Sequence, residues 1–264
     1  MKIFDSHFHI INSKFPLVEN NGYLPPEFTV ANYLNTTKDY NIIGGTIVSG
    51  SFQAFDQEYL IDALNILGKN FYAVANIPIG ISVTELDRLN QANVVAVRFN
   101  LKRGGSEKIQ YIIRLSNFLY EKYNWHTELY IDSKDLSSLK SVLLQIPKFS
   151  IDHLGLSKEG LDDIYYWVEN GIKIKATGFG RIDFDPMLAM KKIYQINPNA
   201  LMFGTDLPST RANIPFTNND VLLIEENFNT NELENIFFKN ALEWYSNKNW
   251  NIYIGRFMYK AIVV

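Results

Sequence analysis

The sequence predicts an α/β protein that folds as a single (β/α)8 TIM barrel. Short β-branched runs alternate with longer helical stretches, and each kind of segment occurs eight times. The length of 264 residues suits one such barrel, which often takes about 250 residues. A doubly wound sheet would alternate in the same way. However, no Gly-x-Gly-x-x-Gly motif follows the first predicted strand, and no Walker A motif occurs.

The predicted strands are short runs of β-branched and aromatic residues that end in polar residues. They span residues 2–9, 44–51, 71–78, 94–100, 125–132, 149–155, 172–178 and 200–206. The polar ends are informative because catalytic groups of such a barrel come from the C-terminal ends of its strands and the loops that follow.

The predicted helices lie between these strands, and several have recognisable start signals. Ser82 and Glu85 have the spacing of a capping box, Asp185 followed by Pro186 suits a first turn, and Ser106 precedes another periodic stretch. The helices are expected at about 28–40, 56–68, 82–91, 106–123, 134–145, 158–169, 185–196 and 219–245.

The chain shows no linker and no internal repeat, so we expect one domain over residues 1–264. Its last part, residues 249–264, is apolar and aromatic and contains nothing that indicates chemistry. We expect this tail to pack on the barrel exterior or at a subunit interface, which makes a homo-oligomer possible.

The composition restricts the classes of function. A hydrophobic fraction of 47% supports a sizeable core, and a net charge of −3 without a basic stripe argues against nucleic acid as a partner. The absence of cysteine excludes disulfides, thiolate nucleophiles and Cys-ligated zinc, and it fits a cytoplasmic protein. No apolar run is long enough for a signal peptide or a membrane span, so we expect no membrane association.

Three of the four histidines and one aspartate are predicted to meet at the mouth of the barrel. His7 and His9 lie two residues apart at the end of the first strand, and because a strand has a period of two they point the same way. His153 follows the sixth strand and Asp206 ends the eighth. Charged groups are rarely buried without partners, so this convergence indicates a site.

Basic residues at other strand ends indicate an anionic substrate. Arg98 ends the fourth strand and Arg181 follows the seventh, while Lys102 and Arg211 are weaker candidates. A guanidinium pairs bidentately with a carboxylate, so these residues suit a small anionic molecule. Alternatively, Arg98 neutralises Glu128 or Asp206 inside the barrel. His126 begins its strand and is expected to be structural, and Arg103 is expected to be a solvated loop charge.

Ordered motifs along the chain resemble the amidohydrolase superfamily. They are D-x-H-x-H at residues 5–9, D-H-L-G at 152–155 and G-T-D at 204–206. The segments VAVRFNL, KATGFGR and KNALEWY, at 95–101, 175–181 and 239–245, resemble the amidohydrolase-2 group, which contains 2-pyrone-4,6-dicarboxylate lactonase and related sugar lactonases. The resemblance covers nearly the whole chain.

This resemblance implies roles for the matching residues. The substrate carbonyl would be polarised, directly or through a metal, by His7, His9 and His153. Asp206 would activate the attacking water. Anionic groups of the substrate would be held by Arg98 and Arg181, and the pocket would be completed by Ser49 or Ser51 and by Tyr130.

The metal content stays open at this level. In the binuclear branches of the superfamily that the chain resembles, the fourth strand ends in a carboxylated Lys or a Glu. This chain has Arg98 at that position, so two metals are not expected. One divalent metal at His7, His9 and Asp206 is possible, and zinc suits two imidazoles and a carboxylate. The lactonase branch that the chain resembles also includes members that need no metal.

The sequence therefore predicts a hydrolase that opens a lactone or carboxylic ester of a small anionic substrate by water attack. Two alternatives remain. One is a zinc-dependent decarboxylase or deacylase of the same superfamily, and the other is a barrel that binds an anionic metabolite without turnover.

Overall fold

Eight parallel strands form one nearly closed barrel in the computed structural model, which describes residues 1–246. The sheet order follows the chain from β1 to β8. The strands are β1 Lys2–Phe8, β2 Asn41–Val48, β3 Phe71–Ala75, β4 Val94–Asn100, β5 His126–Tyr130, β6 Phe149–Ile151, β7 Lys173–Ala176 and β8 Leu201–Phe203. The fold confirms the predicted barrel, whereas the tail at 249–264 lies outside the described residues.

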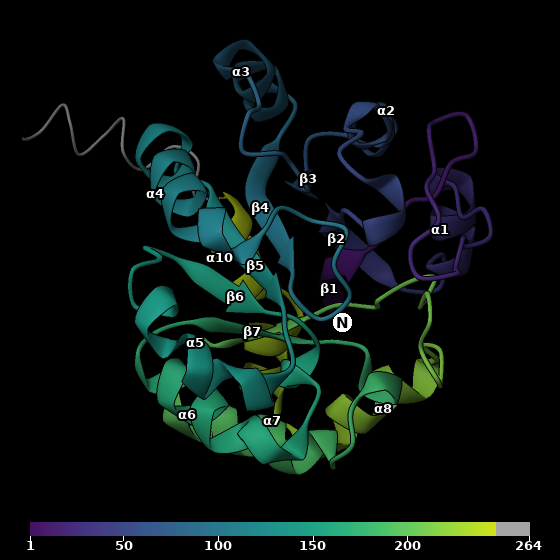
Figure 1. Cartoon of the computed structure of the whole chain (residues 1–264). Coiled ribbons are helices and arrows are strands. Elements are labelled where there is room, and N and C mark those ends of the chain that lie inside the picture. The colour runs from purple at the N-terminus through teal and green to yellow at the C-terminus, as the bar shows by residue number, and fades with distance from the viewer. Residues whose placement is uncertain (247–264) are drawn as a thin grey trace, which may run out of the picture.

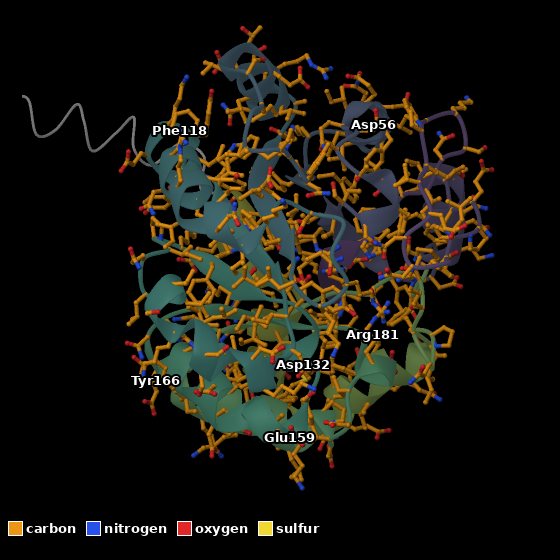
Figure 2. The ribbon with its side chains drawn as sticks, viewed as in Figure 1. Asp56, Phe118, Asp132, Glu159, Tyr166 and Arg181 are labelled. Atoms are coloured by element: carbon orange, nitrogen blue, oxygen red, sulfur yellow. The ribbon has the colours of Figure 1, made fainter. Side chains whose placement is uncertain are left out.

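Helices surround the strands and cover the outside of the barrel (Figure 1). They are α1 Val30–Thr36, α2 Glu58–Leu67, α3 Val83–Gln91, α4 Ile112–Tyr123, α5 Leu136–Leu143, α6 Leu161–Glu169, α7 Pro186–Ile196, α8 Asn218–Asn227, α9 Thr230–Glu234 and α10 Asn240–Ser246. Phe118 of α4 and Tyr166 of α6 lie on this outer ring, whereas Arg181 lies toward the middle of the molecule (Figure 2). No described helix combines the length and apolarity that crossing a bilayer requires.

Two predicted start signals are confirmed, and two helices differ from the prediction. Ser82 caps α3 by accepting from the Glu85 amide, and Asp185 caps α7 with Pro186 in its first turn. The prediction that a helix starts at 106 was wrong, because α4 begins at Ile112 after a loop that contains two positive-φ glycines.

The predicted helix 219–245 is divided into shorter elements. The chain becomes extended after α8, and Asn229 then caps α9 in a capping box with Glu232. A π-helical turn, Asn235–Lys239, joins α9 to α10. Local capping side chains here outweigh the continuous periodicity of the sequence.

The interior of the barrel is apolar at one end and charged in the middle. Phe4 and Tyr245 stack with ring centroids 5.7 Å apart, and Trp244 belongs to the same apolar cluster. Glu128 and Lys175 are fully buried, although both carry ionisable side chains. Helix α10 thus closes the bottom of the barrel and supports a charged layer beneath the mouth.

Candidate active site

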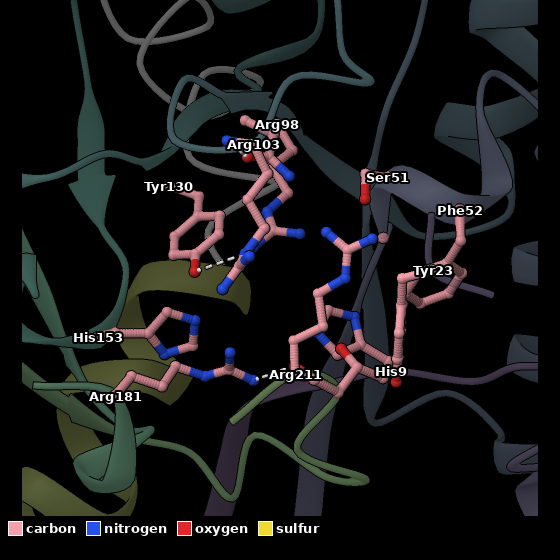
Figure 3. Close-up of a pocket in the computed structure, with 13 residues that line it drawn as sticks. His9, Tyr23, Ser51, Phe52, Arg98, Arg103, Tyr130, His153, Arg181 and Arg211 are labelled. Carbon is pink, nitrogen blue, oxygen red and sulfur yellow. Dashed lines mark hydrogen bonds between the residues drawn. The ribbon is translucent and has the colours of Figure 1, made fainter. Parts of the chain in front are cut away.

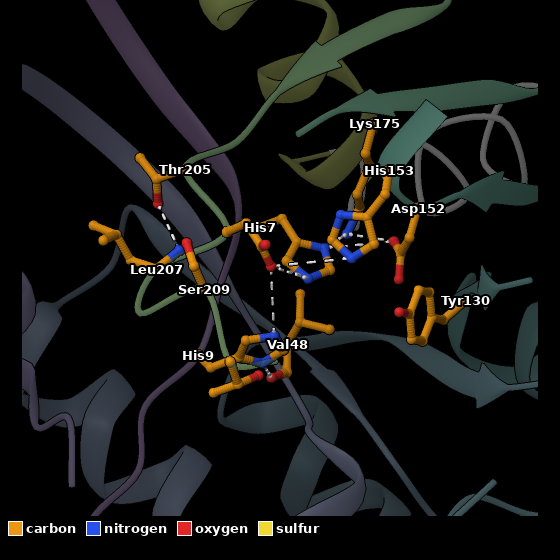
Figure 4. A network of polar contacts seen from close by, with 12 residues as sticks. His7, His9, Val48, Tyr130, Asp152, His153, Lys175, Thr205, Leu207 and Ser209 are labelled. Atoms are coloured by element: carbon orange, nitrogen blue, oxygen red, sulfur yellow. Dashed lines mark hydrogen bonds and ion pairs between the residues drawn. The ribbon is translucent and has the colours of Figure 1, made fainter. Parts of the chain in front are cut away.

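His7, His9 and His153 meet at the C-terminal ends of the strands, as predicted (Figure 4). Asp206 follows β8 and lies beside all three imidazoles. The Nε2 atom of His7 lies 3.9 Å from Oδ1 of Asp206. The Nε2 atoms of His9 and His153 each lie 4.0 Å from the same oxygen. Three imidazoles therefore surround a single carboxylate oxygen.

The backbone beside these residues is held in unusual conformations. His153 has φ = 51° and Asp206 has φ = 60°. Both values lie in the left-handed region, which non-glycine residues rarely adopt. Such a conformation costs on the order of 1–3 kcal/mol and is often found at functional sites. The amide of Asp206 donates to the His7 carbonyl at 2.7 Å, so the ends of β1 and β8 are tied together.

Asp5 reinforces the junction between β1 and β8. Its carboxylate accepts from the Thr205 amide at 2.8 Å and from the Thr205 hydroxyl at 2.7 Å. Further donors are the Tyr33 hydroxyl at 3.1 Å and the His7 amide at 3.2 Å. Burial raises the pKa of Asp5 to about 6, and these donors oppose the rise. Asp5 thereby positions the residues on either side of the site.

The site histidines are held as neutral imidazoles at neutral pH. Burial lowers the pKa of His7, and it lowers the pKa of His9 and His153 well below the usual range. Nearby arginines add to the effect at His9 and His153. His9 Nδ1 lies 2.6 Å from the Val48 carbonyl oxygen and donates to it, so His9 Nε2 presents its lone pair to the site.

One oxygen of Asp206 is occupied and the other is free. The Arg181 Nε donates to Oδ2 of Asp206 at 2.7 Å. The Oδ1 atom of Asp206 and the Nε2 atom of His7 are buried and have no hydrogen-bond partner among residues 1–246. Buried polar atoms are normally satisfied, so these two indicate a place for a water, an ion or a substrate group.

The same atoms fit a metal ion. One ligand atom each from His7, His9 and Asp206 lies within 4.8 Å of the other two, and all three residues are buried. Two imidazole nitrogens and one carboxylate oxygen form a donor set that divalent transition metals accept. Members of the superfamily often bind such a metal, and this His/Asp group could hold one.

Beneath the histidines lies a layer of buried charges that the sequence reasoning did not resolve. Arg98 Nη2 donates to Asp152 Oδ2 at 2.9 Å, and Arg98 Nη1 donates to the Ser49 carbonyl at 2.6 Å. The structure pairs Arg98 with an aspartate, but this is neither Glu128 nor Asp206. Burial alone raises the pKa of Asp152, but contact with His7 and the charges of Lys175 and Arg98 hold it well below the usual range.

A second carboxylate of this layer, Glu128, lies deeper in the barrel. It pairs with Lys175, accepts from the Tyr245 hydroxyl at 2.6 Å and lies 3.1 Å from His126 Nε2. Burial alone raises the pKa of Glu128, but Lys175 and His126 outweigh burial and bring it to about 2. Burial lowers the pKa of His126 to about 4. His126 therefore has the buried, hydrogen-bonded place expected of a structural histidine.

A pocket opens above the histidines and contains four arginines (Figure 3). It has about 370 Å³ of free space, including its opening to solvent. Its wall includes Arg98, Arg103, Arg181 and Arg211, the aromatic residues Tyr23, Phe52 and Tyr130, and also Ser51, His9 and His153. The predicted Ser51, Arg98, Tyr130 and Arg181 are thus brought together beside His9 and His153.

The sequence reasoning undervalued two of these arginines. Arg103 was expected to be a solvated loop charge, but its Nε donates to the Tyr130 hydroxyl at 3.3 Å. The Arg211 guanidinium lies 4.5 Å from the centre of the Tyr23 ring. In the part of the chain that the structure describes, neither arginine forms an ion pair with a carboxylate, whereas Arg98 and Arg181 do. The Arg211 guanidinium also donates to the side-chain and main-chain oxygens of Asn20, so Arg103 is the less committed of the two arginines and is available to a ligand.

Two other predicted polar residues are occupied elsewhere. The Ser49 hydroxyl accepts from the Tyr59 hydroxyl at 2.8 Å and from the Asn76 amide at 3.2 Å. Lys102 Nζ pairs with Asp132 at 2.6 Å. Ser51 is thus the serine that faces the pocket, and Lys102 is partly neutralised.

The comparisons with known proteins agree with the geometry. The amidohydrolase family model matches residues 4–246 of this chain. The chain belongs to the amidohydrolase family. This assignment confirms the resemblance found in the motifs and makes the protein a hydrolase.

Among curated relatives, 4-sulfomuconolactone hydrolase from Hydrogenophaga intermedia is 25% identical over 231 residues, covering 77% of this chain and 74% of that protein. The 2-pyrone-4,6-dicarboxylate hydrolase from Comamonas testosteroni is 24% identical over 160 residues, covering 57% and 51%. The crystal structure of a probable 2-pyrone-4,6-dicarboxylic acid hydrolase from Acinetobacter baumannii, with citric acid bound, has a TM-score of 0.77 at 23% identity. It covers 93% of this amidohydrolase and all of its own chain, and it supports the fold.

Proposed function

We propose that this amidohydrolase opens a lactone that carries at least one anionic group, by direct attack of water on the lactone carbonyl. The observation that carries the proposal is the free Oδ1 of Asp206, surrounded by three imidazoles within 4.0 Å. The adjoining arginine pocket supports the anionic character of the substrate. The names of the two curated relatives, which both describe lactone hydrolysis, support the reaction class.

Asp206 would be the general base of this reaction. Arg181 holds Oδ2, so the carboxylate is oriented with Oδ1 toward the histidines and any water bound there. As the water oxygen bonds to the carbonyl carbon, its proton passes to Oδ1. Proton transfer by a positioned group contributes roughly 10²- to 10⁴-fold to the rate.

The histidines would stabilise the negative charge that forms on the carbonyl oxygen. His7 and His153 are neutral, buried and directed at the same point, so they can polarise the carbonyl without reorganisation. Loss of one preorganised donor typically costs about 2.7–4 kcal/mol in transition-state stabilisation. The ring carbon–oxygen bond then breaks, and Asp206 returns the proton to the departing alkoxide.

A bound metal would act at the same place. We propose zinc as the cation that His7, His9 and Asp206 would hold, because borderline-soft zinc favours imidazole with carboxylate. When bound, it supplies Lewis-acid polarisation of the carbonyl. Metal analysis of protein purified without chelator, together with activity before and after chelation, distinguishes this arrangement from polarisation by the imidazoles alone.

The test of the proposed function uses the lactones named for the two relatives. Purified protein is incubated with 2-pyrone-4,6-dicarboxylate and with 4-sulfomuconolactone, and loss of the ring is followed by absorbance and by mass. The expected product is heavier by one water. Asp206→Asn is expected to lower kcat by about 10² or more with little change in KM, because Asn cannot accept the proton. Wild-type turnover in Asp206→Asn, or release of carbon dioxide instead of hydration, would overturn the proposal.

A further inference from the structure

Lys175 is a buried charge that no step of the proposed reaction uses. It lies in β7, is fully buried and pairs with the Glu128 carboxylate. Its Nζ atom also lies 3.3 Å from His7 Nδ1 and 3.6 Å from Asp152 Oδ1 (Figure 4). Burying an ammonium group is unfavourable unless it is well paired, so this position needs a physical reason.

Glu128 restrains Lys175 from below. Besides Lys175, this carboxylate engages the Tyr245 hydroxyl at 2.6 Å and His126 Nε2 at 3.1 Å. These partners come from α10 and from the start of β5, which are parts of the closed lower end of the barrel. The ammonium group is therefore attached to a rigid base and has little freedom to move away from His7.

Asp152 contacts the same edge of the imidazole as Lys175. Its Oδ1 atom lies 3.4 Å from His7 Nδ1, while Arg98 holds Oδ2 at 2.9 Å. The Nδ1 edge of His7 is thus bracketed by an ammonium and a carboxylate. The opposite nitrogen, Nε2, faces Asp206 Oδ1 at 3.9 Å. The layer balances two positive groups, Lys175 and Arg98, against two negative ones.

We propose that Lys175 is a positioning residue for His7. Together with Glu128 and Asp152, it fixes the imidazole so that Nε2 faces Asp206 and the substrate carbonyl. The inference rests on the proposed function for the role of His7 in the reaction, but the orientation of the ring can be measured without any substrate. Partners that orient a functional histidine from behind typically change affinity or activity by about 10- to 100-fold when removed.

Lys173 provides a matched control on the same strand. It is also a largely buried lysine of β7, but its Nζ donates to the Asn199 carbonyl and has no contact with His7. Lys175→Met is expected to lower kcat by about 10- to 100-fold with little change in KM. Lys173→Met is expected to leave kcat within about twofold. Equal kcat losses in the two variants would overturn the positioning role.

A second variant separates positioning from folding. Lys175→Met leaves Glu128 without its cation, which can destabilise the barrel, whereas Lys175→Met/Glu128→Gln removes both charges. The double variant is expected to melt at a higher temperature than Lys175→Met yet keep a kcat about tenfold or more below the parent. A double variant whose kcat returns to the parent value would show that Lys175 only balances charge.

The position of the His7 ring can also be measured without any enzyme activity, so this test does not depend on the proposed function. The chain contains only four histidines, so imidazole ¹⁵N spectra of labelled protein can be assigned by single substitution. The His7 signals are expected to shift and broaden in Lys175→Met/Glu128→Gln and to keep their positions in Lys173→Met. Unchanged His7 signals in the double variant would overturn the positioning role. A parent protein that hydrolyses neither lactone would overturn the proposed function alone.

Discussion

Replacing Arg103 tests whether the pocket recognises an anionic group. Arg103 lies in the pocket wall and donates to the Tyr130 hydroxyl, and among the described residues it forms no ion pair with a carboxylate. Arg103→Met should therefore weaken substrate binding without leaving a buried carboxylate unpaired. Arg98→Met is different, because Arg98 neutralises the buried Asp152, so that change should lower stability as well as activity.

The expected magnitude follows from the contact that Arg103 can offer. A hydrogen bond to a charged group is worth about 1.5–3 kcal/mol, and Arg103 is half-buried, so the lower end of this range applies. About 1.5 kcal/mol corresponds to roughly a tenfold loss of kcat/KM. Most of this loss should appear in KM, because Arg103 lies away from the reacting atoms.

The assay compares a dianionic lactone with a neutral lactone of similar size. Arg103→Met should reduce kcat/KM for the dianionic substrate and leave the neutral one nearly unchanged. Arg88→Met is a suitable control, because Arg88 pairs with Glu58 and Glu85 on the protein surface. The reasoning is refuted if both lactones lose the same factor, since Arg103 would then support the pocket wall and not the anion.

Three further predictions concern two buried polar residues beneath the site and one exposed helix cap. The pKa of His126 is about 4 in the folded protein and 6.5 in the unfolded chain. Between pH 4 and 6.5 the folded state therefore binds fewer protons than the unfolded state, and stability falls as the pH drops through this range. His126→Gln should remove about 3 kcal/mol of this pH dependence, measured as the difference in denaturant unfolding free energy between pH 7 and pH 4; an unchanged pH slope would contradict it. Tyr245→Phe removes a buried hydrogen bond to Glu128 and should lower stability by about 2 kcal/mol, seen as a melting temperature lower by roughly 5 °C, whereas an unaltered melting curve would mean that the bond contributes nothing. Ser82→Ala removes the cap of the exposed start of α3 and should cost only about 1 kcal/mol, with kcat unchanged; altered kcat would show that this helix affects the site.

The barrel and the meeting of three histidines with one aspartate could be predicted because both depend on local regularities. Alternation of strands and helices indicates the barrel, and a period of two places His7 and His9 on one face. The rule that strand ends gather at one mouth then adds His153 and Asp206. Helix starts were predictable where a capping side chain is specific, as at Ser82, but not at 106, because the Ser106 hydroxyl accepts from the Asn100 amide and a 3-10 turn at Ile109–Tyr111 precedes α4.

The identity of the pairs could not be predicted, because each joins residues far apart in the chain. Nothing local distinguishes Arg98, which is committed to Asp152, from Arg103, which is free to meet a ligand. Ser49 and Ser51 look alike in sequence, yet the Ser49 hydroxyl is occupied by Tyr59 and Asn76.

By itself, the sequence determined the fold class, the family and the four residues at the centre of the site, since these follow from periodicity and from short motifs in order. Only the tertiary structure decided how the charges are distributed around them. It placed Lys175 and Asp152 against the same edge of His7 and left Oδ1 of Asp206 without a partner. The physical reason is that a buried charge must find its counter-charge in space, and closing the barrel selects which distant residue that is.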